Sequence, residues 1–359
     1  MNGGGRINAI THDRDASYTA FIAAHFPLRL NYIYGDYNSD ALFTPIENGV
    51  TGATSDGVVY QDRYSPATPA PLYVTTNNRG IFKSTNGGTS FAAINNGLPS
   101  MIGKLSRLAF DPTLNVPESS KILYLGLSDE GGVYKSTNGG TNWVSSSTGL
   151  STPLAMSVNH VTVDSNNPAI VWIATGAGVF KSVDSGASWT QKFSALDGAG
   201  STLPSGIVRV RAGNSNEIYI ANNHVNANGT LVTASSGILK STNGGDTWTN
   251  ILPDVKGSQV RVTTSGEIYA GVSAPFGAPA VYRSTNGGTS FSVYSTNLQG
   301  SDIRGFGIAA NESAVLSLTL ENGFYTHDAV SPPPTVTLSG AITEAPGIFS
   351  RVFFGYQTT

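Results

Sequence analysis

The sequence has no cysteine and few charged residues. The absence of cysteine excludes disulfides, thiolate nucleophiles and cysteine-based zinc sites. Charged residues make up 12% of the 359 residues, the formal net charge is −3, and the 20 basic residues are scattered along the sequence. We therefore expect no nucleic-acid partner. No apolar run reaches the about 18 residues that span a bilayer, so we expect no membrane insertion.

The sequence also lacks a recognisable targeting segment at its start. The first residues, MNGGGRINAIT, have neither the basic nor the apolar part of a secretory signal peptide. Glycine is abundant, with 42 residues, and Ser, Thr and Asn fill much of the remainder. Such a composition is typical of β-rich proteins. We expect a secreted or cell-surface protein whose signal peptide has been removed from this chain.

One nine-residue segment, called the box below, occurs five times. The copies read KSTNGGTSF, KSTNGGTNW, KSVDSGASW, KSTNGGDTW and RSTNGGTSF, and they begin at Lys83, Lys135, Lys181, Lys240 and Arg283. Their starting points lie 43 to 59 residues apart, and short apolar strands such as ILYLGL and IVWIAT precede them. A strand-rich repeat of roughly 40–50 residues indicates the blades of a β-propeller.

Each box is predicted to form a hairpin turn. Its Asn-Gly pair supplies the positive φ angles of a tight two-residue turn, and its Asn or Asp side chain can bond nearby amides. The closing aromatic ring is expected between neighbouring sheets, where burial stabilises by roughly 1.5–3 kcal/mol. The structural residues of the five boxes are Ser84, Asn86, Gly88, Phe91, Ser136, Asn138, Gly140, Trp143, Ser182, Asp184, Gly186, Trp189, Ser241, Asn243, Gly245, Trp248, Ser284, Asn286, Gly288 and Phe291.

The pattern Ser-x-Asp/Asn-x-Gly-x-Ser/Thr-Trp/Phe resembles the Asp-box, or BNR, repeat of sialidase-type, sortilin-type and xyloglucanase-type propellers. The resemblance covers roughly residues 80–295. The chain departs from it because Asn replaces Asp in four boxes and only Asp184 is acidic. The resemblance implies an all-β propeller of four-stranded antiparallel blades, with the boxes on the face away from the ligand site.

The blade number follows from the flanking segments. RINAIT, TAFIAA and LNYIYG are predicted as strands of a first blade, and IRGFGIAA, AVLSLTL and NGFYTHD as strands of a last one. The prediction is seven blades, with six or eight as alternatives. Residues 1–330 are predicted to form the propeller. Residues 331–359, which begin with SPPP, are either its closing strand or the start of a further domain.

Two long segments between strands are the candidate binding surface, because long loops in compact folds often carry function. They are Ala221–Gly237 and Val272–Ala280, and the candidate residues are Asn223, His224, Asn226, Asn228 and Phe276. Tyr32 and Tyr34 alternate on a predicted strand, so they share one face and can stack on sugar rings. The alternatives are a solvated loop without a partner and tyrosines that pack between blades.

One segment fits part of a calcium-loop pattern. Asp36, Asn38, Asp40 and Glu47 stand at its positions 1, 3, 5 and 12. Ala41 replaces the turn glycine, however, so the alternative is an ordinary polar turn. Calcium is the only cofactor that the sequence suggests.

No catalytic set is recognisable. Glycoside hydrolysis needs two carboxylates about 5–10 Å apart, but Glu217 and Glu267 occupy equivalent repeat positions and Asp129 and Glu130 are neighbours on one loop. In the resembling families, xyloglucan-degrading enzymes typically use two propellers, and sialidases need an arginine triad and an Arg-Ile-Pro motif that this chain does not supply. We expect a non-catalytic binding propeller for a glycan or protein. The alternatives are a glycoside hydrolase with a carboxylate pair and an architectural domain of a larger surface or adhesin protein.

Overall fold

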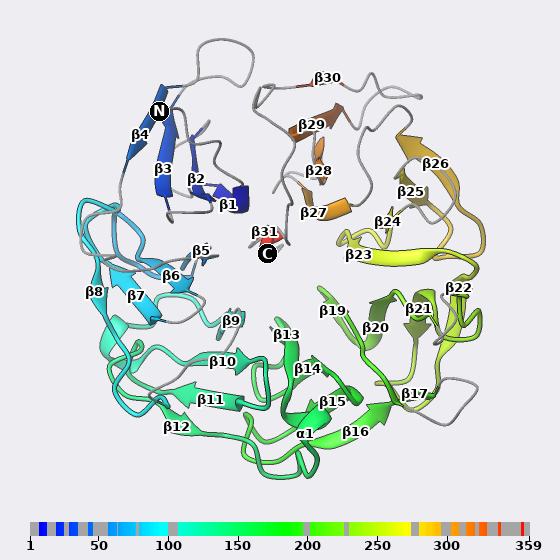
Figure 1. Cartoon of the computed structure of the whole chain (residues 1–359), viewed down its shortest axis with the longest axis horizontal. Helices are drawn as coiled ribbons and strands as arrows, with labels where there is room; N and C mark the ends of the chain where they lie inside the picture. Colours follow the sequence, from blue (N-terminus) through cyan, green and yellow to red (C-terminus); the bar gives the residue numbers. More distant parts are fainter. Residues whose placement is uncertain are drawn as a thin grey trace.

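A computed structural model of the chain describes sixteen ranges of residues. They are 7–12, 19–24, 29–34, 42–45, 57–62, 64–76, 79–99, 107–196, 202–225, 230–273, 280–295, 303–308, 314–319, 323–328, 337–338 and 353–354. The strands in these ranges form antiparallel sheets arranged around one axis (Figure 1). This radial arrangement is a β-propeller.

The described strands fall into seven sheets of four or five strands and one two-stranded hairpin. The first sheet holds β1 (Ile7–His12), β2 (Thr19–Ala24), β3 (Arg29–Tyr34), β4 (Leu42–Pro45) and β31 (Phe353–Phe354). The second holds β5 (Gly57–Gln61), β6 (Leu72–Thr76), β7 (Gly80–Ser84) and β8 (Ala92–Ala93). The third holds β9 (Arg107–Phe110), β10 (Leu123–Leu127), β11 (Gly132–Ser136) and β12 (Val144–Ser145).

The remaining sheets follow the same order. The fourth holds β13 (Val158–Val163), β14 (Val171–Thr175), β15 (Gly178–Ser182) and β16 (Thr190–Phe193). The fifth holds β19 (Ile207–Arg211), β20 (Asn214–Asn222), β21 (Gly237–Ser241) and β22 (Thr249–Leu252). The sixth holds β23 (Lys256–Val262), β24 (Ile268–Ser273), β25 (Ala280–Ser284) and β26 (Ser292–Ser295). The seventh holds β27 (Ile303–Ile308), β28 (Ala314–Thr319), β29 (Gly323–Asp328) and β30 (Thr337–Leu338).

Within the described ranges, little regular structure lies outside these sheets. The hairpin β17 (Ala195–Leu196) and β18 (Thr202–Leu203) joins the fourth sheet to the fifth. The described part of the chain has two short helical segments, α1 (Pro153–Met156) and the 3₁₀ turn η1 (Glu118–Ser120). The blade number of the whole chain stays at our prediction of seven.

The last two described strands, β30 and β31, belong to different sheets. Strand β31 pairs in parallel with β1, with Phe353 opposite Ala9, and it lies near the axis (Figure 1). Strand β30 pairs with β29 as the fourth strand of the last sheet, with Leu338 opposite Tyr325. The domain boundary after residue 330 stays a prediction.

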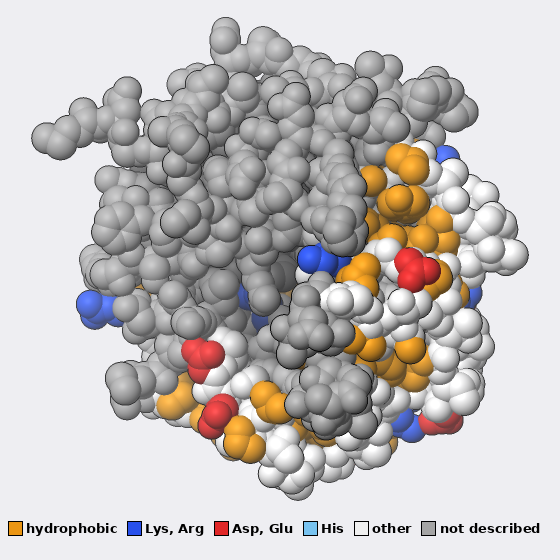
Figure 2. Space-filling view, turned by 45° about the vertical axis from the view of Figure 1, so that its right-hand side comes forward, with side chains coloured by type: hydrophobic (Ala, Val, Ile, Leu, Met, Phe, Trp, Pro, Cys, Tyr) orange, Lys and Arg blue, Asp and Glu red, His pale blue; other side chains and the backbone are white. Residues whose placement is uncertain are grey.

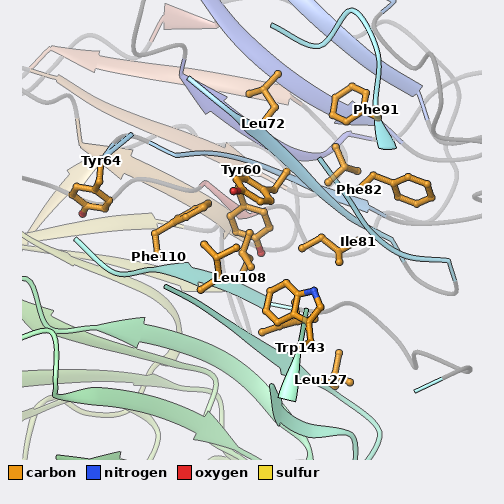
Figure 3. Packing of buried hydrophobic residues seen from close by; sticks show 14 residues of the cluster. Tyr60, Tyr64, Leu72, Ile81, Phe82, Phe91, Leu108, Phe110, Leu127 and Trp143 are labelled. Carbon is orange, nitrogen blue, oxygen red and sulfur yellow. The ribbon is translucent and has the colours of Figure 1, made fainter. Parts of the chain in front are cut away.

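The core lies between neighbouring blades. The second strands LYVTT, LYLGL and VWIAT are buried along their full lengths, because a blade is covered on both faces by its neighbours. Figure 3 shows this packing between the second and third sheets. There the rings of Tyr73 and Phe110 meet edge to face, with centroids 5.3 Å apart.

The boxes form one recurring hydrogen-bonded loop. In the first box, Ser84 Oγ donates to Asn86 Oδ1 over 2.8 Å and accepts from the amide of Gly88 over 2.9 Å. Asn86 Oδ1 also accepts from the amide of Ser90 over 3.0 Å. The corresponding bonds recur in the other four boxes. The side chains therefore close the loop, as the sequence predicted.

The detailed turn prediction was wrong. The positive φ angles fall on the two residues after Asn or Asp, at 67° and 89° for Gly87 and Gly88 and at 56° and 84° for Ser185 and Gly186. The loop runs from Ser84 to the closing aromatic residue and is longer than a two-residue hairpin. The Asn or Asp is instead the hydrogen-bond acceptor at its centre.

The closing aromatic residues reach back to the preceding blade. Trp143 is 3% exposed and its Nε1 donates to the carbonyl of Ile94 over 2.8 Å. Trp189 makes the same bond to Ser146 over 2.6 Å, and Trp248 bonds Lys192 over 3.0 Å. The predicted position between sheets is confirmed for these three rings.

The first residue of the box reaches forward to the next blade. The Nζ atoms of Lys83, Lys135, Lys181 and Lys240 donate over 2.8–3.3 Å to backbone carbonyls in the following box, which belong to Gly139, Ser185, Gly244 and Gly287. Each ammonium also lies 5.1–5.6 Å from the centre of an aromatic ring on its own second strand. Each of the first four boxed blades is thus joined to its successor by a cation.

The acidic box predicts a pH effect. Hydrogen bonds from the Ser188 hydroxyl, the Ser182 hydroxyl and the Ser188 amide lower the pKa of Asp184 to about 2, from an ordinary 3.8. Because the folded pKa is depressed, this carboxylate stabilises the fold above about pH 4, and that stability is lost as the pH falls towards 2. Asp184→Asn should leave the urea midpoint at pH 7 within experimental error, since four boxes already use Asn. The difference between the urea midpoints of variant and wild type should then change in favour of the variant between pH 4 and pH 2. An unchanged difference across that range would contradict the assignment.

Candidate binding face

The strand register defines two faces of the ring. In the fourth sheet, Val171 pairs with the box residue Ser182 at one end, and Thr175 pairs with Gly178 at the other. The end that carries the boxes is called the box face below. The opposite end, where second strands turn into third strands, is called the loop face. The segment Asn223–Ser236 lies on the loop face because Asn222 pairs with Gly237.

The described part of this segment is folded back on itself. Val225 and Leu231 form an isolated bridge, and the amide of Val232 donates to the carbonyl of His224 over 3.0 Å. Asn250 Nδ2 on β22 holds the far side by donating to the carbonyls of Thr233 and Ser236 over 2.8 and 2.7 Å. The segment is therefore attached to its own blade before any ligand arrives.

His224 is the internal anchor of the segment. Its side chain is buried, its Nδ1 lies 2.8 Å from Ser235 Oγ, and its Nε2 lies 2.6 Å from the carbonyl oxygen of Pro204. A carbonyl only accepts, so Nε2 carries the proton and Nδ1 accepts from Ser235. Burial lowers the pKa of His224, which keeps the ring neutral. We therefore assign His224 to holding the segment and not to direct ligand contact.

A hydrogen-bonded path connects this segment with the axis. Pro204 and Ser205 follow the hairpin β17–β18, and the carbonyl of Ser205 accepts from Asn159 Nδ2 on β13 over 3.0 Å. The carbonyl of Asn159 in turn accepts from Arg107 Nε on β9 over 3.1 Å. Three consecutive blades thus contribute to one connected hydrogen-bonded network. Asn159 and Ser205 were not predictable as partners of His224, because they lie far from it in the chain and carry no motif.

The structure describes only some of the other predicted binding residues. Asn223 is exposed at the start of the segment. Asn226, Asn228 and Phe276 lie outside the described residues. Tyr32 and Tyr34 lie on β3, where they pair with Phe21 and Thr19, and their side chains are outside the described part. Asp36, Asn38, Asp40 and Glu47 are also outside the described residues, so the calcium loop stays a prediction.

Several carboxylates on the box face are bound by other groups of the protein. Asp62, Asp111 and Asp164 each follow a first strand and accept, over 2.8–2.9 Å, from the amide two residues further on. Glu267 binds Arg283 through both carboxylate oxygens, and Glu217 pairs with Arg211 over 3.0 Å and Lys240 over 3.3 Å. This confirms the repeat role predicted for Glu217 and Glu267. On the loop face, Asp129 and Glu130 are adjacent and exposed, with φ angles of 54° and 66°.

The described residues offer neither a metal site nor a membrane-spanning helix. Nowhere in the described ranges do three His, Asp or Glu side chains gather in a way that could hold a metal ion. The helices within those ranges are all too short or too polar to cross a membrane.

Comparison with solved structures supports the fold. The chain is similar to the GH74 xyloglucanase from Xanthomonas campestris, with a TM-score of 0.68, 16% identity, and coverage of 93% of this chain and 54% of that one. It is similar to the extracellular domain of a candidate one-component system from B. thetaiotaomicron, with a TM-score of 0.61, 12% identity, and coverage of 91% and 39%. A chain of the mitotic checkpoint complex matches with a TM-score of 0.59, 10% identity, and coverage of 89% and 88%.

These likenesses establish the propeller and not an activity, because the identities are low. The chain spans about half the length of the xyloglucanase. No protein-family model and no curated protein sequence matches it.

Proposed function

We propose that this chain is a non-catalytic binding module that works outside the cell and recognises a glycan through its loop face. The observation that carries the proposal is the built segment Asn223–Ser236. It is anchored by the buried ring of His224 and by Asn250, so its exposed groups are presented in a fixed arrangement. Preorganisation lowers the entropic cost of binding a flexible ligand.

The exposed groups favour a sugar over a protein partner. Asn223, Thr230 and Thr233 are exposed on or beside the segment, and amides and hydroxyls suit the hydroxyl groups of a glycan. A protein interface is instead usually centred on buried aromatic and apolar anchors. The structure describes one large apolar side chain of high exposure near this face, Leu154 on α1, which is 49% exposed.

Two further features agree with this proposal. The Ser-Asn/Asp-Gly-aromatic pattern of the boxes resembles the Asp-box repeat, which favours assignment to that group of propellers. The solved neighbours include a xyloglucanase and an extracellular domain. Both likenesses support a carbohydrate ligand that is bound outside the cell.

The second candidate function is glycoside hydrolysis, which the similarity to the GH74 fold favours. It needs two carboxylates across a cleft, one of them with a raised pKa. Among the described carboxyls, burial raises the pKa of Asp62, but this residue lies on the box face and is bound to Lys121. A polysaccharide turnover assay decides between the two functions, and measurable hydrolysis would overturn the non-catalytic one.

The binding surface is tested with a glycan array followed by titration of the best ligand. Asn223→Ala and Thr233→Ala should each weaken binding by about three- to tenfold, the range expected for one lost hydrogen bond. Thr137→Ala is the matched control, because Thr137 is exposed on the box face. Equal affinity of all three variants and the wild type would place the ligand elsewhere.

A further inference from the structure

The strands closest to the axis have an unusual charge pattern. In each sheet the first strand lies near the centre of the ring (Figure 1). The seven first strands read INAITH, GVVYQ, RLAF, VNHVTV, IVRVR, KGSQVRV and IRGFGI. They contain Arg, Lys and His but no Asp or Glu, although the chain as a whole has a net charge of −3. Basic residues that are scattered in the sequence are therefore gathered by the fold.

Five side chains form what is called the axial cluster below. They are Tyr60, Arg107, His160, Arg209 and Arg261, one from each of five consecutive sheets. Arg209 and Arg261 pair with Tyr219 and Tyr269, one residue in from the box end of their second strands.

Arg107 and His160 stand two residues further towards the loop face, opposite Gly126 and Ala174. Because side chains alternate along a strand, residues two apart in register point to the same side. The cluster therefore faces one way from blade to blade.

The cluster is deep but not closed. Tyr60, Arg107, His160 and Arg261 are 4–7% exposed, whereas Arg209 is only half-buried on its inner strand. Arg209 Nε itself is shielded from solvent, so the exposed part of this side chain lies on its other atoms. Figure 2 shows blue Lys and Arg side chains close to the centre of the molecule.

The groups of the cluster act on one another. Burial, together with the charges of Arg209, Arg261 and Arg107, lowers the pKa of His160 well below its usual value. Burial lowers the pKa of Arg209 to about 10, and burial followed by the charge of Arg209 lowers the pKa of Arg261. His160 Nδ1 and Arg209 Nε make no hydrogen bond with any residue that the structure describes. Cations held together away from water are unfavourable unless negative charge compensates them.

We propose that the axial cluster binds a small oxygen anion, with a carboxylate or an inorganic oxyanion as the ligand. A guanidinium is planar and presents paired donors that match the two oxygens of such a group. Arg107, Arg209 and Arg261 come from different blades, so they reach the axis from different directions. The bound anion offsets their repulsion and gives Arg209 Nε an acceptor. Arg107 also belongs to the hydrogen-bonded path towards the segment Asn223–Ser236, but anion binding at the axis does not require glycan binding.

The test is thermal unfolding of the full chain at constant ionic strength, with chloride replaced by inorganic phosphate in one arm and by acetate in the other. An anion that binds only the folded state raises Tm by mass action, and a rise of about 3–4 °C is expected at about 100 times Kd. A rise with phosphate alone, with acetate alone or with both identifies the anion class. No rise above chloride in either arm would overturn the proposal.

The variant Arg209→Gln separates this site from general salt effects. It should abolish the anion-dependent rise in Tm, while its Tm in chloride stays equal to or above that of the wild type, because one repelling charge is gone. Arg79→Gln is the control, since Arg79 is an exposed residue just before β7, and it should keep the full rise. A full rise in Arg209→Gln would refute the assignment.

If Arg209→Gln does not fold, a measurement on the wild type tests the proposal instead. Arginine Nε–H signals in ¹⁵N spectra should shift on addition of inorganic phosphate or acetate, with the same Kd as the thermal data give. Arg209→Lys keeps the charge but loses the paired donors of the planar guanidinium. It should weaken anion binding by at least about tenfold. Signals that stay unmoved at saturating anion in the wild type would also refute the proposal.

Discussion

Replacing Trp172 by alanine should lower the free energy of unfolding by about 3–5 kcal/mol, the range for a fully buried aromatic residue. Trp172 is 0% exposed at the boundary between the fourth and fifth sheets, where it packs with Val208, Ile218 and Leu239. Its ring also lies 5.1 Å from the ammonium of Lys181. The cavity cannot collapse easily, because the strands around it are fixed by their own ladders. Urea denaturation followed by tryptophan fluorescence and circular dichroism gives the value.

Two controls decide whether this loss reflects packing. Trp172→Tyr should keep most of the stability, because Tyr73, Tyr124, Tyr219 and Tyr269 hold the same place in other sheets. In the third sheet the hydroxyl of Tyr124 donates to the carbonyl of Ser185 over 3.0 Å, and in Trp172→Tyr we expect the new hydroxyl to reach the equivalent carbonyl of Gly244. Val144→Ala, at a side chain 69% exposed, should change stability by less than about 0.5 kcal/mol. A loss near 1 kcal/mol for Trp172→Ala would show that the blades can close the gap.

The second large effect is expected at the buried ion pair of Asp62 and Lys121. Their charged atoms are 3.4 Å apart and both side chains are 0% exposed. Lys121→Met leaves the buried carboxylate of Asp62 without its counter-charge. We expect a loss of about 3–5 kcal/mol at pH 7, because an uncompensated buried charge is worse than no charge. The double variant Lys121→Met with Asp62→Asn, which keeps an acceptor for the amide of Tyr64, should recover most of that loss. A double variant as unstable as Lys121→Met would contradict this account.

The same pair gives a pH signature. Burial raises the pKa of Asp62, and the Lys121 charge only partly offsets this. A raised carboxyl pKa means that the folded protein holds the proton more tightly, so stability falls as the pH rises from about 4 through the raised value. In Lys121→Met the offset is lost, so the fall should become larger and extend to higher pH. Urea midpoints of the wild type and Lys121→Met between pH 4 and pH 8 measure the difference.

The sequence predicts well what repeats within one blade. Box spacing, second strands such as LYLGL and VWIAT, and the closing aromatics all depend on contacts that each blade makes in the same way. The same pattern therefore occurs five times in the sequence, and this repetition predicts the propeller. The aspartates after the first strands were missed, although Asp62, Asp111 and Asp164 recur at one repeat position and show that signal.

Features that depend on how blades meet were not predictable in this way. Arg107, Arg209 and Arg261 look scattered because each lies on a different blade, and only ring closure places them around one axis. His224 looked like a surface residue because a loop histidine carries no mark of the Pro204 carbonyl that its ring meets. A useful signal was nevertheless present, since first strands such as RLAF, IVRVR and KGSQVRV contain basic residues and no acid.

The lysine bond between successive boxes has a direction, and this bears on how such a ring can grow. Each blade from the second to the fifth sheet supplies a lysine that donates to the next blade. Each blade from the third to the sixth sheet supplies the carbonyl that accepts from the preceding lysine. A copied blade inserted among them would be compatible with both neighbours at once. The series ends at Arg283, which binds Glu267 of its own sheet instead. Duplication should thus be tolerated before the sixth sheet and penalised after it, which gives a simple rule for building larger rings from this chain.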